Sequence, residues 1–105
     1  MSYDIYLEAT EPYASSVEIG NITYNIAPMW VVALGGAGIR RFEGAPGVEA
    51  AGPLSEGVER MRADPATYRA MNPPNGWGNY EGALEYLDRL ARACALHPSH
   101  RIRIS

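Results

Sequence analysis

The sequence predicts an α+β fold, a small three-stranded antiparallel sheet with helices packed on one of its faces. Two segments near the start of the chain and one at its end alternate apolar with polar residues, which is typical of half-buried strands. Between them, apolar residues recur at intervals of three and four, as on the buried face of a helix. The expected order is ββααααβ, within a single domain that spans residues 1–105.

The three strands are predicted over SYDIYLEA, SVEIGNI and RIRIS. The connection between the first two is short, which favours an antiparallel hairpin. The alternation assigns one face of the sheet to Tyr3, Ile5, Leu7, Ala9, Val17, Ile19, Asn21, Ile102 and Ile104. The arginines of the last strand are then expected on the exposed face, opposite Asp4, Glu8 or Glu18.

The first two helices are separated by a glycine-rich region. PMWVVAL, residues 28–34, follows a capping residue, Asn25, and the run GGAG ends the helix. We expect residues 40–52 to form a loop or a weak helix, because glycine is frequent there. Pro53 then opens a helix over residues 53–63, since proline suits the first turn.

The last two helices have clearer start signals. Asp64 is a capping residue followed by a proline, and it predicts a short helix over residues 65–71. The longest periodic segment covers residues 79–96, with Asn79 or Gly78 as its cap and a His-Pro pair at its end. Its expected buried stripe is Tyr80, Leu84, Leu87, Ala91 and Cys94.

Composition narrows the classes of partner. The formal net charge of -3 and the pI of about 5.3, without any basic cluster, argue against a nucleic-acid partner. No apolar run approaches the length of about 18 residues that a membrane span needs, and the first residues do not resemble a secretion signal. One cysteine excludes an internal disulfide and suits a reducing compartment, so we expect a cytoplasmic protein.

The chain contains histidine, cysteine and carboxylate side chains, the types used most often in catalysis, but their positions do not indicate an active site. His97 and His100 flank the end of the last helix, where histidines are usually solvated. Cys94 lies on the apolar stripe of that helix, where a thiol is usually inert. No carboxylate spacing sets up an acid and base pair, and no metal-ligand cluster occurs. These patterns favour a protein that is not an enzyme, and they predict no catalytic residue, metal or cofactor, without excluding catalysis.

The stretch NPPNGWGNYE is the first candidate ligand site. Asn75-Gly76 favours a tight turn, and Gly76 and Gly78 leave the backbone beside Trp77 uncovered. The helix that follows offers free backbone N–H groups, which suit a phosphate, and the indole offers a face for a base. The alternative is that the tryptophan fills the core. The residues predicted to bind a ligand here are Asn75, Gly76, Trp77, Gly78, Asn79 and Tyr80.

The stretch GNITYNIAPMW is the second candidate. Its polar groups lie where a strand gives way to a helix, a position at which ligand-binding groups often converge. Ordinary turn chemistry with a core tryptophan is the alternative. The predicted ligand-binding residues are Asn21, Thr23, Tyr24, Asn25 and Trp30. Arg40, which follows the glycine run, could complete an anion site.

These two stretches resemble a family of small uncharacterised proteins encoded by phages and prophages. The resemblance runs from Tyr3 to Ile104, and its most specific parts are NITYNIAPMW and NGWGNYE. The residues that carry it are Asn21, Thr23, Asn25, Pro28, Met29, Trp30, Asn75, Gly76, Trp77, Gly78, Tyr80 and Glu81. The glycine-rich run between the stretches is the part least like the family. The resemblance implies a viral or mobile-element setting, hence a host-cell cytoplasm, and implies no activity.

Three functions fit these observations. The favoured one is an anti-defence sponge, which binds a small nucleotide-derived signal of host immunity without cleaving it, an expectation taken from the setting. The second is a protein-binding inhibitor or adaptor that uses exposed aromatic residues as anchors. The third is a small nucleotide-processing enzyme that uses Glu81, Tyr80 or a histidine. Because a deep pocket is hard to close in so short a chain, and because aromatic residues are numerous, we also expect a homo-oligomer.

Overall fold

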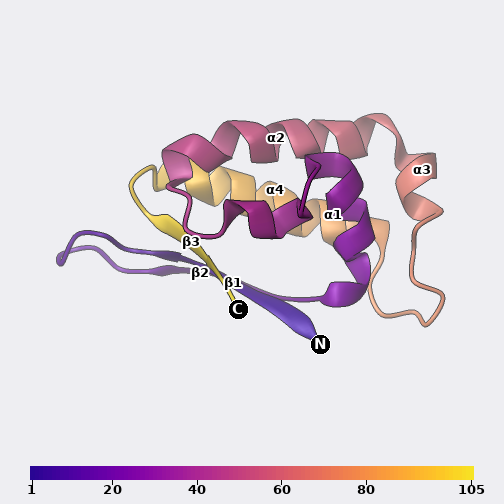
Figure 1. The fold of residues 1–105 in the computed structure, drawn as a ribbon, viewed down its shortest axis with the longest axis horizontal. Coiled ribbons are helices and arrows are strands. Elements are labelled where there is room, and N and C mark those ends of the chain that lie inside the picture. The colour runs from indigo at the N-terminus through magenta and orange to yellow at the C-terminus, as the bar shows by residue number, and fades with distance from the viewer.

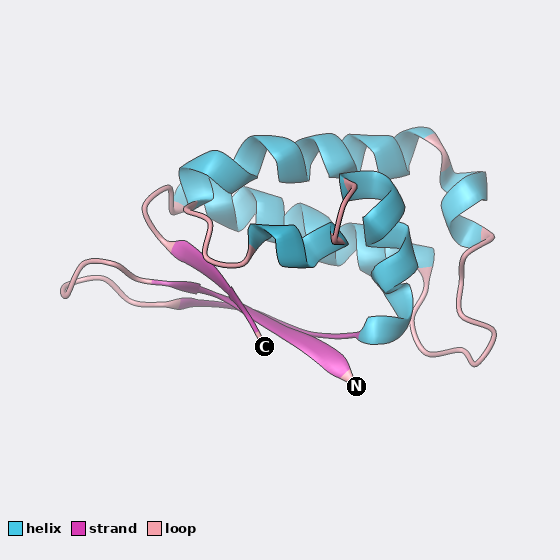
Figure 2. Ribbon diagram, viewed as in Figure 1, coloured by secondary structure: helices cyan, strands magenta, loops and turns pink.

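The computed structural model describes residues 1–105 and confirms the predicted α+β fold and its order ββααααβ. Helices cover one side of a three-stranded sheet, and both termini lie at the sheet (Figure 1). The strands are β1 (Ser2–Glu8), β2 (Val17–Thr23) and β3 (Arg101–Ile104). The helices are α1 (Ala27–Leu34), α2 (Gly47–Ala63), α3 (Pro65–Arg69) and α4 (Tyr80–Leu96), with short 3-10 helices η1 (Tyr24–Ile26) and η2 (Gly38–Phe42). Figure 2 distinguishes these helices from the strands and loops.

The sheet has the antiparallel order β2-β1-β3, and a bulge corrects one prediction about its faces. Ile5 pairs with Gly20, but the next residue of β1 pairs with Glu18, so Ile19 is the extra residue. Gly20 accommodates the bulge with a φ of 118°. The extra residue reverses the alternation, and Asn21 therefore pairs with Asp4 on the exposed face instead of sharing the face of Ile19.

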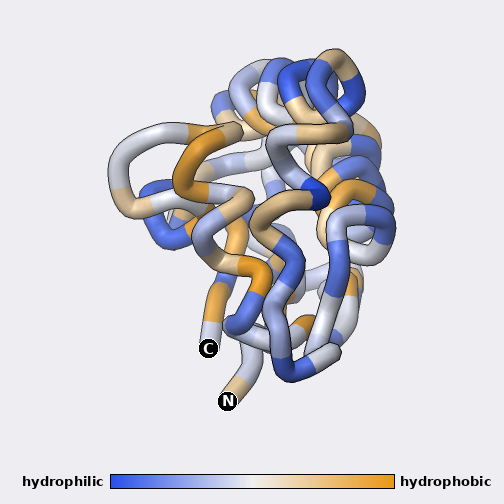
Figure 3. Tube along the Cα trace, turned by 90° about the vertical axis from the view of Figure 1, so that its right-hand side faces the viewer, coloured by the Kyte–Doolittle hydropathy of each residue, from blue (hydrophilic) through white to orange (hydrophobic).

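The buried face of the sheet forms one core with the helices. Tyr3, Ile5 and Leu7 of β1 are buried as predicted, whereas Ala9 lies beyond the strand and is half-buried. On the exposed face, Nε of Arg103 lies 3.0 Å from Oε1 of Glu8, one of the predicted pairings. Seen from the end that carries α3, the helical turns change between hydrophilic and hydrophobic residues, as expected for helices with one buried face (Figure 3).

Helix α2 begins earlier than the sequence predicted. It starts at Gly47, so residues 40–52 contain the end of η2 and the first turns of α2, and Pro53 lies inside the helix. Gly52 reduces the cost of this proline, because it has no Cβ to clash with the proline ring. Burial of Ala50 and Leu54 holds the turns on both sides of Pro53 against the core.

The helix caps follow side-chain chemistry, with one correction. Asn79 accepts a hydrogen bond from the N–H of Gly82 at the start of α4, and Asp64 accepts one at the start of α3, both as predicted. Asn25 does not cap α1 as predicted, because the cap position of α1 is Ile26, which makes no side-chain hydrogen bond; Thr23 instead caps the short helix η1. The buried residues of α4 are Tyr80, Ala83, Tyr86, Leu87, Leu90, Ala91 and Cys94, a wider stripe than predicted, with Leu84 only half-buried.

No helix is both long and apolar enough to cross a membrane.

Candidate functional site

A groove of about 480 Å³ lies where the N-terminal strand and the end of β2 meet the loop that precedes α4. Its lining residues are Met1, Ser2, Asn21, Thr23, Asn25, Asn75 and Trp77. Both stretches that the sequence singled out therefore contribute side chains to the same groove. Whether they bind a ligand there stays a prediction.

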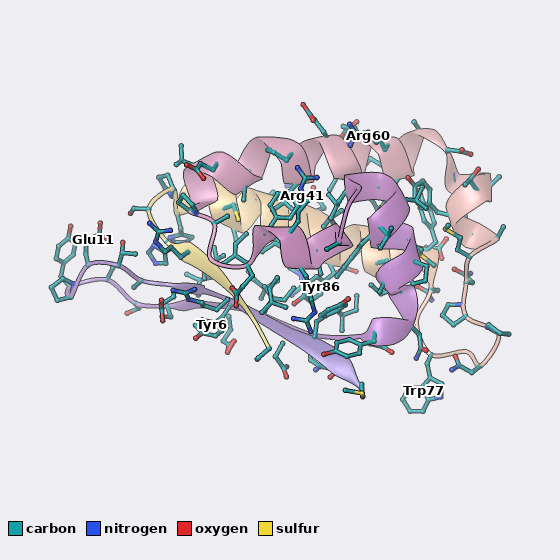
Figure 4. All side chains as sticks on the ribbon, viewed as in Figure 1. Tyr6, Glu11, Arg41, Arg60, Trp77 and Tyr86 are labelled. Atoms are coloured by element: carbon teal, nitrogen blue, oxygen red, sulfur yellow. The ribbon has the colours of Figure 1, made fainter.

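Trp77 does not fill the core, because its side chain is 68% exposed. Figure 4 shows it projecting from the loop before α4, on the side of the molecule where the N-terminus lies. The Asn75 side chain shapes this loop, since its Oδ1 accepts a hydrogen bond from the Trp77 N–H at 2.9 Å. Gly76 supplies the positive φ of 77° that the turn needs, and it lies outside the groove lining. The indole face is therefore accessible from solvent.

Gly78 explains why the two stretches meet. A Cβ at this position would lie 2.7 Å from Cγ2 of Thr23 and 2.8 Å from Cγ2 of Ile26. Only glycine allows the loop to approach the end of β2 so closely, and its φ of 96° also favours glycine. Gly78 is thus a packing residue that positions Trp77 opposite Asn21 and Asn25, and it does not line the groove.

The three asparagine side chains of the groove are held by hydrogen bonds within the chain. Nδ2 of Asn21 donates to Ser2 Oγ at 2.7 Å and to Asp4 Oδ1 at 3.0 Å. Nδ2 of Asn25 donates to Thr23 Oγ1 at 2.9 Å. Asn75 uses its Oδ1, which accepts from the Trp77 N–H, and its Nδ2 makes no hydrogen bond within the chain. The unused groups are carbonyl oxygens beside β2 and an amide N–H₂ beside the indole.

Two of the N–H groups at the start of α4, which the sequence predicted to be free for a phosphate, are already hydrogen-bonded. The Tyr80 N–H donates to Asn72 Oδ1 at 2.8 Å, and the Gly82 N–H donates to Asn79 Oδ1 at 2.7 Å. Glu81 adds negative charge at the same turn, and the hydrogen bond from Arg69 lowers the pKa of this carboxyl group. Asn79 is therefore a cap and not a groove residue, and two of the first N–H groups of the helix are already bound and cannot hold an anion.

Two predicted ligand-binding residues are core residues instead. Trp30 is completely buried, and its Nε1 donates to the Ala83 carbonyl at 3.2 Å. Tyr80 is 3% exposed, and its hydroxyl donates to the Met61 carbonyl at 2.7 Å. Both side chains thus have their polar atoms satisfied inside the protein and present no surface to the groove.

Tyr24 and Arg40 contact each other and lie outside the groove lining. Nη2 of Arg40 donates to the Tyr24 hydroxyl at 3.0 Å, and its guanidinium lies 5.3 Å from the centre of the Tyr3 ring. This arrangement holds Arg40 on an aromatic surface. It does not complete an anion site in the groove, contrary to the prediction.

Cys94, His97 and His100 lie near the C-terminal end of α4, whereas the groove lies near its N-terminal end. Cys94 is fully buried, and burial raises the pKa of its thiol to about 11. His100 is buried and not solvated as predicted; its Nε2 lies 2.9 Å from the Ser15 carbonyl oxygen, and its Nδ1 has no partner. No group of three or more His, Cys, Asp or Glu side chains is placed to hold a metal ion.

Sequence reasoning missed two groups of residues at the groove and at the start of α4. Met1 and Ser2 line the groove because β1 pairs with β2, and nothing in their local sequence indicates this. The Asn72 side chain accepts a hydrogen bond from the N–H of Tyr80, eight residues later, at the start of α4. An asparagine before a proline pair is a turn signal, but its hydrogen-bond partner is set by the path of the loop.

A second hollow of about 490 Å³, lined by Thr10, Pro46, Val48, Pro98, Ser99 and Arg101, was also not predicted.

Comparison of the chain with protein-family models, with curated proteins and with solved structures finds no match. The fold and the groove define a class of molecule, a small α+β domain with a polar groove flanked by an exposed tryptophan.

Proposed function

We propose that this chain is a small-ligand-binding protein that holds a nucleotide-derived molecule in the groove without cleaving it. The accessible indole of Trp77 beside three asparagine side chains is the observation that supports this function. An exposed aromatic face binds flat heterocycles by stacking, and amide groups supply hydrogen bonds in the plane of the ring.

The lining also favours binding over catalysis. Its side chains are those of Met1, Ser2, Asn21, Thr23, Asn25, Asn75 and Trp77, and none of them ionises near neutral pH. A hydroxyl group needs a neighbouring base to act as a nucleophile, and none of the lining side chains provides one. Retention of an intact ligand is the chemistry that this set of groups supports best.

The biological role that we propose is sequestration of a nucleotide signal of host immunity, as an anti-defence sponge in a phage-infected or prophage-carrying cell. The support for this role is the resemblance of NITYNIAPMW and NGWGNYE to small phage proteins. We further propose that the protein acts as a homo-oligomer in the host cytoplasm.

A second candidate function is docking of a protein partner on the same surface. It is favoured by the exposure of two large apolar side chains at the groove, 68% for Trp77 and 98% for Met1. An exposed tryptophan is a common anchor of protein interfaces. In that case a protein partner, and not a nucleotide base, would cover the indole of Trp77.

The experiment that tests the first function compares Trp77→Ala with Tyr13→Ala by calorimetric titration of a nucleotide panel that includes cyclic dinucleotides. Trp77→Ala should lower affinity roughly ten- to a hundredfold, because one stacking face is lost. Tyr13 is 88% exposed and is not a groove residue, so its variant should bind normally. Both variants should keep the wild-type melting temperature, since exposed side chains contribute little to stability.

Heating the loaded protein and analysing the released molecule then separates binding from catalysis. Recovery of the intact nucleotide supports sequestration, and recovery of a product supports the enzyme. If the wild-type protein binds no nucleotide in the panel, the proposed function is wrong and protein docking becomes the better explanation of Trp77.

A further inference from the structure

We infer that Asn75 is a site of spontaneous modification, where attack by the following backbone nitrogen converts the side-chain amide to a carboxylate. The co-reactant is water. The site lies in the groove, in the loop that carries Trp77. Three features of this loop carry the inference, namely the residue that follows Asn75, the hydrogen bonds of its side chain, and the exposure of the turn.

The reaction begins when the backbone nitrogen of Gly76 loses its proton and forms a bond to Cγ of Asn75. The Cγ–Nδ2 bond then breaks, Nδ2 leaves as ammonia, and a cyclic imide remains. Water opens the imide at either of its carbonyls. Opening at Cγ gives aspartate, and opening at the main-chain carbonyl gives isoaspartate, in which the chain runs through Cβ and Cγ. The net change is amide plus water to carboxylate plus ammonium, without oxidation or reduction.

The first feature is the residue that supplies the attacking nitrogen. Asn75 is followed by glycine, which has no side chain to obstruct closure of the ring. At the other four asparagines the next residue is isoleucine, proline or tyrosine, and these asparagines are Asn21, Asn25, Asn72 and Asn79. A branched or aromatic side chain beside the nitrogen hinders ring closure, and proline has no N–H to lose. Asn75 is therefore the asparagine of this chain that suits the reaction.

The second feature is the hydrogen bonding of the Asn75 side chain. Its Oδ1 accepts from the Trp77 N–H at 2.9 Å. Negative charge develops on this oxygen when Cγ is attacked, and the N–H group stabilises that charge as a donor in an oxyanion hole does. Nδ2, the leaving group, makes no hydrogen bond within the chain, so solvent can protonate it as it departs.

The third feature, exposure, offsets the one contact that opposes the reaction. The Gly76 N–H donates to the Pro73 carbonyl at 3.1 Å, so the turn must open before the nitrogen can lose its proton. Asn75 and Gly76 are both exposed, and a Cβ at residue 76 would meet nothing within 4 Å. Exposed loop tips of this kind open locally at little cost in free energy. The hydrogen bond therefore slows the reaction and does not stop it.

Either product changes the groove beside Trp77. A carboxylate at residue 75 brings a negative charge to the loop, and isoaspartate also adds a carbon atom to the main chain within the turn. In isoaspartate the oxygen that accepts from the Trp77 N–H becomes a main-chain oxygen. Under the proposed function, on which this step alone rests, an anionic nucleotide then binds more weakly. The binding capacity of the protein therefore declines as the protein ages.

The test incubates the full folded chain at mildly alkaline pH and physiological temperature, and digests samples with trypsin over several weeks. Residues 70–89 are released as one peptide that contains Asn72, Asn75 and Asn79, so two internal controls accompany the site. Fragment masses locate the conversion of amide to carboxylate, and an isoaspartate-specific methyltransferase detects the second product. We expect Asn75 to react first, and faster as the pH rises, because the attacking nitrogen must lose a proton.

The same incubation in guanidinium chloride measures the reaction without the fold. We expect the folded rate to lie within about tenfold of the unfolded rate, since the turn opens locally and the Trp77 N–H stabilises the attacked carbonyl. Asn75→Gln, whose longer side chain closes a ring much less readily, should remove the early mass increase. The inference is overturned if Asn75 stays intact in the folded chain while the unfolded chain reacts, or if Asn72 or Asn79 reacts first.

A binding measurement tests the consequence separately. Asn75→Asp reproduces the aspartate product and keeps an oxygen for the Trp77 N–H, so its melting temperature should match that of the wild type. Calorimetry with a nucleotide that the wild-type protein binds should show roughly a fivefold loss of affinity. Equal affinity would overturn the effect on binding. If no nucleotide binds the wild-type protein, the proposed function fails, while the mass measurement, which uses no ligand, still decides the modification.

Discussion

The residues around Trp77 show how single side chains build the groove. Asn75 and Gly76 form the turn, and Gly78 lets the loop pack on Thr23 and Ile26. Each residue acts on the position of the backbone and leaves the indole uncovered. The loop is therefore fixed on both sides of Trp77, although Trp77 itself makes little contact with the core.

Replacing Gly78 by alanine should be much more costly than replacing Gly76. Both glycines have a positive φ, which costs an alanine about 1–2 kcal/mol. Only the Cβ of residue 78 would also overlap side-chain atoms, which adds about 1–3 kcal/mol, whereas the Cβ of residue 76 meets nothing within 4 Å. Urea unfolding of Gly78→Ala and Gly76→Ala measures the difference. Equal losses would show that the close approach of the loop to β2 does not constrain residue 78.

At the scale of the elements, Gly47 at the start of α2 lies against the backbone at the end of α4. A Cβ there would lie 2.4 Å from the His97 carbonyl oxygen and 2.6 Å from that of Cys94, and both are backbone atoms. The backbone N–H groups of Gly47 and Val48 donate to the carbonyls of His100 and Pro98. The start of α2 is thereby tied to the turn between α4 and β3, which explains why the helix begins six residues before Pro53.

The side chains of α4 also cover the outer edge of β2. The Tyr86 hydroxyl donates to the Gly20 carbonyl at 2.6 Å, and Nη1 of Arg89 donates to the Ile19 carbonyl at 2.7 Å. Unpaired backbone groups on an edge strand invite association with other strands. Here the carbonyls of Ile19 and Gly20, at the bulge, are occupied by two side chains of α4.

We predict that Gly47→Ala will lower the free energy of unfolding by about 2–4 kcal/mol, because backbone carbonyls cannot move aside without separating α2 from α4. Gly57→Ala is the matched control in the same helix. Its Cβ would meet the end of the Leu34 side chain at 2.5 Å, which can shift, and alanine favours the helix. Its change should stay within about 1 kcal/mol. Chemical denaturation of both variants tests the contrast, and a mild effect of Gly47→Ala would contradict this account of the contact.

At the scale of the whole molecule, the core takes up most of the aromatic residues. Tyr3, Trp30, Tyr68, Tyr80 and Tyr86 are buried, and Trp30 lies against Tyr3 and Tyr86, with ring centroids 5.8 Å and 5.6 Å away. Tyr13 and Trp77 are the exposed ones. The abundance of aromatic residues is therefore a weaker argument for an oligomer than the sequence indicated.

The homo-oligomer stays a prediction, and it now depends on other exposed apolar side chains. Val31 and Val32 of α1 are 44% and 51% exposed, and Trp77 and Met1 add apolar surface at the groove. Light scattering at about 50 µM, a concentration at which weak interfaces form, should give a dimer or larger. A monomer at that concentration would contradict the prediction. The experiment does not depend on which ligand the groove holds.

The sequence by itself determined the elements of this protein, because their signals are local. Alternation in β1 and β3, the stripe of α4 and the capping residues Asp64 and Asn79 depend on neighbours a few positions apart. The same local chemistry identified the two stretches that line the groove. The positions of these signals along the chain give the order ββααααβ. With so few elements, the simplest packing places the helices on one face of the sheet.

Only the tertiary structure decided which polar and aromatic groups remain free. Trp30 and Trp77 both stand near a turn and a helix start, yet Trp30 packs against Tyr3 and Tyr86 and is buried, whereas Trp77 stays largely exposed. Asn72 takes a helix N–H that was expected to bind a phosphate, and a bulge places Asn21 on the exposed face. Burial and hydrogen-bond occupancy depend on contacts between residues distant in sequence, and a local sequence pattern does not predict such contacts.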